Sequence, residues 1–106
     1  MRVLDGDTVD ARVDLGFKVH FNIRIRLHGI NAPETRTRDR EEKQRGFAAK
    51  ARCKKLLDDA EFVVLESHGV GKFGRCLGSL WLDGERDLAQ TLIDEGHGVA
   101  YFGGKR

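Results

Sequence analysis

Cysteine, proline and long apolar runs are scarce in this sequence. Its two cysteines, Cys53 and Cys76, are too few for a disulfide framework and too far apart for a CxxC metal pair. No apolar run approaches the roughly 18 residues that a membrane span needs, so no membrane partner is expected. The first residues contain no apolar stretch of signal-peptide length, so nothing in this chain directs export and a cytoplasmic location is expected. One proline beside 13 glycines indicates many turns rather than disorder, because the apolar content is ordinary.

The chain has 106 residues, of which 40% are hydrophobic and 34% charged, and this amounts to one domain with a modest core. We therefore predict a single domain over residues 1–106. The formal net charge is only +2, but residues 36–55 hold nine Lys and Arg against three acids. Such a basic segment is typical of a protein with a polyanionic partner, and equally of a solvated loop and helix face. Charge alone favours the second interpretation.

Alternation of polar and apolar residues predicts the strands. It is strict over residues 18–28, which indicates a strand with one face toward a core. That face consists of Val19, Phe21, Ile23, Ile25 and Leu27. Shorter patterns predict further strands over residues 8–14, 62–65, 75–82 and 99–102. Turn residues predict turns at residues 15–16, 68–71 and 83–84.

A helix is predicted after a long polar loop over about residues 35–45. Its apolar stripe consists of Ala49, Cys53, Leu56, Leu57 and Ala60. A second, short helix is predicted over residues 87–95, with Asp87 as its N-cap and Gly96 just beyond its end. Together these elements predict an α+β fold that is mainly β, namely a small five-stranded OB-fold Greek-key barrel with two or so helices.

Charged residues gather in three segments where strands and turns do not require them. These segments are Asp-Gly-Asp-Thr at residues 5–8, the run from Arg26 to Glu34, and Lys-Phe-Gly-Arg at residues 72–75. Together they supply what phosphodiester hydrolysis needs. Arginine forks neutralise charge on the phosphate, Asp oxygens bind a hard divalent cation, and a nearby carboxylate orients or deprotonates water.

At these segments the sequence resembles the staphylococcal-nuclease-like (thermonuclease) domain family. The matching motifs are residues 5–8, Arg-Leu-His-Gly-Ile-Asn-Ala-Pro-Glu at 26–34, Gly-Arg at 74–75 and Gly-His-Gly-Val-Ala-Tyr at 96–101. Their order and approximate spacing agree over nearly the whole chain. The resemblance implies an OB-like barrel and a calcium-dependent endonuclease that hydrolyses phosphodiester bonds of DNA and/or RNA.

The resemblance also implies a role for each matching residue. The catalytic set is Arg26, Glu34 and Arg75, in which Glu34 orients the attacking water and the two arginines clamp the phosphate. The implied calcium ligands are Asp7, Asn31 and the backbone carbonyl of Ala32. The implied substrate contacts are Lys72, Phe73 and Tyr101.

The sequence departs from the family pattern at four points. Asn31 stands where the family usually has Asp, so weaker calcium binding is expected. Phe73 keeps a ring without the tyrosine hydroxyl, and a second family tyrosine would fall on Gly103. The domain is also shortened at both ends relative to longer members. A barrel of this length is expected to be less stable or to gain stability from self-association.

An alternative function remains open at this point. Some domains of the family have lost their catalytic residues and serve as nucleic-acid- or protein-binding OB-type modules. The presence of Asp7, Arg26, Glu34 and Arg75 favours the enzyme, whereas Asn31 and the shortened ends favour the binding module.

Overall fold

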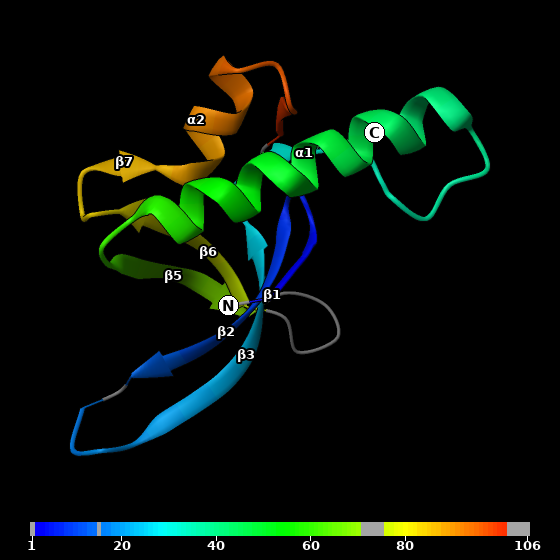
Figure 1. Cartoon of the computed structure of the whole chain (residues 1–106). Coiled ribbons are helices and arrows are strands. Elements are labelled where there is room, and N and C mark those ends of the chain that lie inside the picture. Colours follow the sequence, from blue (N-terminus) through cyan, green and yellow to red (C-terminus); the bar gives the residue numbers. More distant parts are fainter. Residues whose placement is uncertain (1, 15, 71–75, 102–106) are drawn as a thin grey trace.

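The computed structural model describes residues 2–14, 16–70 and 76–101 (Figure 1). The strands are β1 (Arg2–Asp5), β2 (Thr8–Asp14), β3 (His20–Leu27), β4 (Gly29–Asn31), β5 (Val63–Val70), β6 (Cys76–Leu82), β7 (Arg86–Asp87) and β8 (Val99–Tyr101). The helices are α1 (Arg40–Asp59) and α2 (Leu88–Asp94). None of the described helices is long and apolar enough to cross a membrane.

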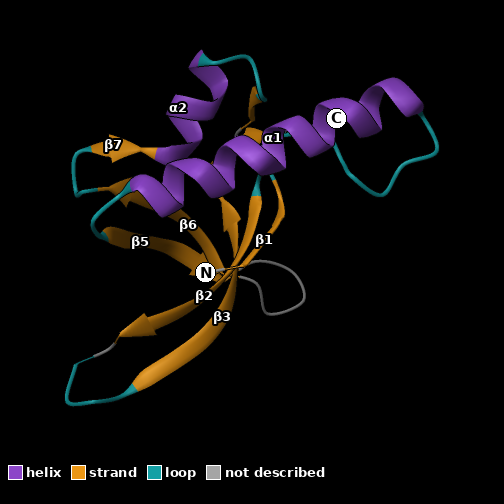
Figure 2. Cartoon of the chain, in the orientation of Figure 1, coloured by secondary structure: helices purple, strands orange, loops and turns teal. Residues whose placement is uncertain are grey.

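One mixed sheet forms most of the structure. Its strands follow the order β1-β2-β3-β6-β5, with β7 added to β6, and a separate two-stranded sheet joins β4 to β8. All neighbours are antiparallel except β3 and β6, which run parallel. Figure 2 shows α1 running across this sheet with α2 beside it. The predicted α+β, mainly β fold with two helices is confirmed, and all five predicted strands are present.

The core lies between the sheet and the two helices. The largest fully buried side chains include Ile25 and Leu27 of β3, Leu80 and Leu82 of β6, and Leu88 and Leu92 of α2. The predicted apolar stripe of α1 also faces this core. Ala49, Cys53, Leu56 and Leu57 are buried, and Ala60, just after the helix, packs against the core. Hydrophobic burial of this stripe, rather than helix propensity, is what holds α1 on the sheet.

Helix α1 begins at Arg40, so the prediction of a loop up to residue 45 was wrong. Asp39 caps the helix, because its Oδ1 accepts hydrogen bonds from the N–H groups of Glu41 and Glu42. The acidic side chains of these two residues also suit the positive end of the helix dipole. The first turns carry no apolar stripe, so periodicity could not reveal them.

The apolar face predicted for residues 18–28 reaches the core only in part. Ile25 and Leu27 are buried, whereas Val19 and Phe21 are 52% and 53% exposed. The reason is visible in Figure 1, where the outer end of the β2–β3 hairpin extends away from the rest of the chain. The alternation is therefore that of a strand longer than the core it crosses.

The prediction of a turn over residues 68–71 was also wrong for residues 68–70, which the structure describes. Strand β5 continues through Val70, and its register with β6 shifts between Ser67 and Gly69. Gly69 has a φ of +124°, a value that glycine adopts without steric cost. This glycine therefore marks a β-bulge rather than a turn. At the other predicted turns, Gly16, Asp83 and Gly84 all have positive φ.

Both cysteines are free and buried. Burial raises the pKa of the Cys53 thiol to about 12, so this thiol stays protonated at neutral pH. Both side chains belong to the hydrophobic core. Asp87 caps α2 through the N–H of Ala89, at 3.2 Å from its Oδ1, and Gly96 follows the helix with a φ of +82°.

Candidate functional site

Asp7 lies in the tight connection between β1 and β2 and is only 7% exposed. Its Oδ2 accepts a hydrogen bond from the backbone N–H of Ala32 at 2.9 Å, and its Oδ1 accepts one from the Thr8 hydroxyl at 3.1 Å. A buried carboxylate is costly unless it is paired in this way. Asp7 therefore fastens the segment after β4 to the start of β2.

Arg26 completes this arrangement from β3. Thr8 and Arg26 are register partners in the β2–β3 ladder, which brings the arginine beside Asp7. One guanidinium nitrogen, Nη2, lies 3.6 Å from Asp7 Oδ2, and the other, Nη1, donates to the carbonyl of Leu27 at 2.9 Å. The guanidinium thus has a fixed orientation in a mostly buried position. The structure brings together three of the predicted residues: Asp7, Arg26 and Ala32.

Asn31 and Tyr101 lie on neighbouring strands of the small second sheet, two register positions apart. Asn31 ends β4, where its partner on β8 is Val99, and Gly29 is the partner of Tyr101. Both residues are half-buried. Tyr101 therefore lies on the strand next to the one that leads into the segment of Ala32 and Glu34.

Glu34 has an exposed side chain on a closely held backbone. A Cβ added at Gly46 of α1 would lie 2.5 Å from the carbonyl oxygen of Glu34, so helix and loop touch directly. The next residue, Thr35, donates from its hydroxyl and its N–H to Asp5 Oδ1, at 2.7 and 3.2 Å. The main chain of Glu34 is therefore fixed from two sides, although the residue as a whole is exposed.

Close packing of small residues explains why α1 passes so near this site. A Cβ at Gly6 would lie 2.8 Å from the Cβ of Ala49 and 3.1 Å from the Cβ of Ala32. The glycine of the Asp-Gly-Asp-Thr motif is thus required by a helix crossing. The packing roles of Gly6 and Gly46 could not be predicted from the sequence, because their contacts exist only after α1 docks. The Thr35–Asp5 contact was not predicted either, since it joins residues 30 positions apart.

The other predicted site residues, Lys72, Phe73 and Arg75, lie outside the described residues. Among the residues that the structure describes, no three His, Cys, Asp or Glu side chains are placed to hold a metal ion. The available donors are oxygens, as Ca²⁺ prefers, but Asp7 is the single carboxylate among the predicted ligands and Arg26 already lies beside it. Such a set fits a weakly held hard cation.

The fold and this geometry define a small OB-type domain with a carboxylate–guanidinium site between its sheet and its long helix. A family model described as "Staphylococcal nuclease homologue" matches residues 24–106. The chain belongs to this family, which confirms the resemblance.

Two curated proteins are similar over most of the chain. It is 30% identical to the Micrococcal nuclease of Shigella flexneri and 29% identical to Protein ParB of Escherichia coli, each over 112 aligned positions. The alignments cover 95% of this chain but only 56% and 55% of these relatives. The chain therefore spans about half the length of the curated relatives it matches.

Proposed function

We propose that the chain is a metal-dependent endonuclease that hydrolyses phosphodiester bonds of DNA, RNA or both. The observation that carries this proposal is the contact of a buried carboxylate, Asp7, with both Arg26 and the backbone of Ala32. In a member of the staphylococcal nuclease family, this contact supports a role for Asp7 in cation binding and for Arg26 in phosphate binding. The name of one relative, Micrococcal nuclease, supports the same activity.

Each residue has a chemical task in this proposal. Arg26 offers a planar guanidinium fork to the phosphate and stabilises the charge that grows on its oxygens. Glu34 orients or deprotonates the attacking water, a task that suits an exposed carboxylate on a fixed backbone. Tyr101 contacts the substrate from β8. Lys72 and Phe73 contribute further substrate contacts, and Arg75 is the second phosphate clamp.

Asp7, Asn31 and the Ala32 carbonyl are the proposed ligands of Ca²⁺. When bound, the ion supplies Lewis-acid polarisation of the phosphoryl group. Asn31 contributes an amide oxygen without a charge, so the ion is held weakly. The substrate's own phosphate adds negative charge to this position, which ties cation binding to substrate binding.

A second candidate function is a nucleic-acid- or protein-binding module without catalysis. The observation that favours it is the low charge of the donor set, in which Asp7 is the one carboxylate and already contacts Arg26. A barrel of this kind keeps its binding surface even where a cation no longer binds.

Digestion of single-stranded DNA, with Ca²⁺ and with a chelator, separates the two functions. The parent chain is expected to cleave only with the metal. Glu34→Gln is expected to lose on the order of 10²–10³ in kcat, because it removes a charge acting on the reacting water. Glu61→Gln, the same change at an exposed position outside the site, is the matched control and should leave kcat unchanged.

Three results have distinct meanings in this assay. Equal rates for Glu34→Gln and the parent would remove Glu34 from the mechanism. Binding of the DNA without turnover over a series of divalent metals would favour the binding module. Cleavage by Asn31→Asp at a lower Ca²⁺ concentration than the parent requires would support Asn31 as a ligand, since the variant adds a carboxylate.

A further inference from the structure

A cleft of about 340 Å³ opens beside the candidate site. Four of its lining side chains are basic and come from four separate parts of the fold. They are Arg2 of β1, Arg24 of β3, Arg36 of the loop before α1, and Lys50 of α1. The wall toward the candidate site is formed by Asp5 and Thr35, the pair that holds the backbone next to Glu34.

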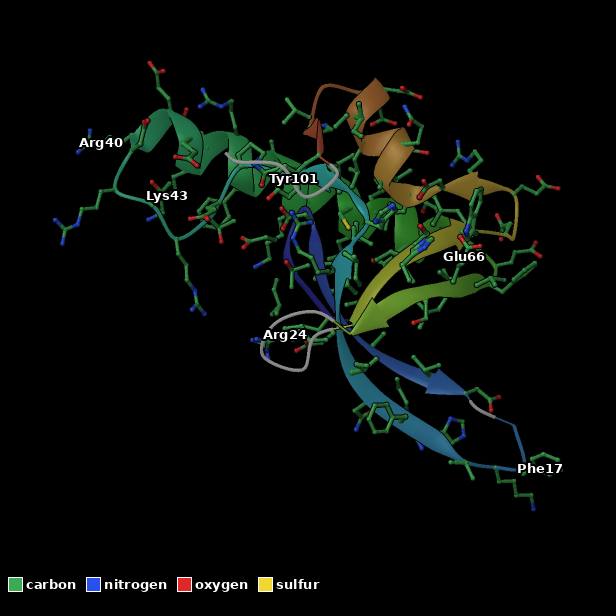
Figure 3. All side chains as sticks on the ribbon, turned by 180° about the vertical axis from the view of Figure 1, so that it is seen from behind. Phe17, Arg24, Arg40, Lys43, Glu66 and Tyr101 are labelled. Carbon is green, nitrogen blue, oxygen red and sulfur yellow. The ribbon has the colours of Figure 1, made fainter. Side chains whose placement is uncertain are left out.

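Two acids near this cleft, Asp5 and Asp10, are already engaged in hydrogen bonds. Asp5 accepts two hydrogen bonds from Thr35, so its carboxylate holds together the wall of the cleft. Asp10 holds Arg24 through two hydrogen bonds, at 2.8 and 3.3 Å, and this contact lowers the pKa of Asp10. In Figure 3 the Arg24 side chain points to the same side of the view as Arg40 and Lys43, where α1 begins.

Three of the four basic side chains form no ion pair in the described structure. Arg2, Arg36 and Lys50 have no carboxylate within ion-pair distance among residues 2–14, 16–70 and 76–101. Like charges brought together from distant parts of the chain repel each other and destabilise the fold, unless an anion compensates them. No contact inside the described molecule explains why they converge, so an external anion is the remaining partner.

We propose that this cleft binds the backbone phosphates of a single nucleic-acid strand on one side of the bond to be cleaved. The inference rests on the proposed function, because it places the cleft along the path of the substrate. The described lining contains no aromatic ring on which a base could stack. Contact is therefore made through phosphate charge, and it is insensitive to base sequence.

Equilibrium binding in a chelator tests this proposal without cleavage. The probe is a fluorescent single-stranded oligodeoxythymidylate of about 12 nucleotides, within the range of known single-strand sites. Its affinity for the full chain is measured by anisotropy over a series of salt concentrations. For each cation removed, by Arg36→Ala or Lys50→Ala, the slope of log K against log salt should fall by about 0.7, or about fivefold in affinity near 0.1 M salt.

The matched control is Lys54→Ala, which removes the same charge from an exposed position of the same helix outside the cleft. Its salt slope should equal that of the parent, and far-UV circular dichroism checks that all variants are folded. The double variant Arg36→Ala/Lys50→Ala should bind about 25-fold more weakly than the parent near 0.1 M salt. Equal effects of Lys50→Ala and Lys54→Ala on the salt slope would overturn the proposal that the cleft binds phosphate, because binding would then depend only on net charge.

The two proposals can fail separately in these measurements. If the variants differ from the parent in salt slope as expected, but the parent cleaves with no metal, the proposed phosphate-binding cleft is supported and the nuclease proposal is refuted. If the parent cleaves but its binding is indifferent to Arg36 and Lys50, the nuclease proposal stands and the cleft falls.

Discussion

The inner and outer halves of the β2–β3 hairpin share one pattern of residues but have different surroundings. The inner half buries Val9 and Ile25 completely and holds Arg26 beside Asp7. The outer half carries Phe21, which is 53% exposed, and ends at Phe17, which is fully exposed at the hairpin tip (Figure 3). The comparison teaches that alternation reports which side of a strand is apolar, whereas the neighbouring elements decide how far the core extends.

The largest difference between the halves is expected at Ile25. Ile25→Ala removes a fully buried side chain and leaves a cavity, so the free energy of unfolding should fall by about 3 kcal/mol. Urea denaturation followed by circular dichroism measures this loss. Because Arg26 follows Ile25 on β3, the proposed nuclease activity should also become more sensitive to temperature. A loss below about 1 kcal/mol would mean that the inner half is not the core of the sheet.

A smaller effect is expected where α1 clamps the loop next to the inner half. Gly46→Ala would place a Cβ 2.5 Å from the Glu34 carbonyl oxygen, and such overpacking costs about 1–3 kcal/mol. Alanine favours a helix over glycine by about 1 kcal/mol, so the net destabilisation should be about 1 kcal/mol.

Ala51→Gly, at an exposed position of the same helix, measures the intrinsic propensity alone and serves as the control. The kcat of Gly46→Ala should fall as well, because Glu34 must move. Stabilisation by Gly46→Ala would show that the helix and the loop do not touch.

The smallest effect on stability is expected in the outer half. Phe21→Ser replaces a half-exposed ring and should change the free energy of unfolding by no more than about 0.5 kcal/mol. The same urea titration that is used for Ile25→Ala measures it. Destabilisation of about 2 kcal/mol or more would mean that the outer half is covered in solution, for example by a second copy of the chain.

Much of the site was predictable from the sequence because a hairpin is a local structure. The strands predicted over 8–14 and 18–28, joined by a short turn, already pair Thr8 with a residue near Arg26. Asp7 and Arg26 therefore had to be neighbours. The segment from Arg26 to Glu34 then follows directly along the chain.

The remaining parts depend on tertiary packing. The polar first turns of α1, the contact of Gly46 with Glu34 and the basic cleft all require the helix to dock on the sheet. No periodicity carries that information, because residues such as Lys50 and Arg24 are distant in sequence and each looks like an ordinary surface charge. The separate β4–β8 sheet was missed for a similar reason, since a three-residue strand such as β4 is too short to show alternation.

The carboxylate of Asp7 latches three segments of the chain to one another. A related protein without catalytic activity would still need this contact, because without it Ala32 and Arg26 lose a shared anchor. Selection for a stable barrel alone would thus preserve Asp7. Its presence in a related sequence is therefore weak evidence of activity.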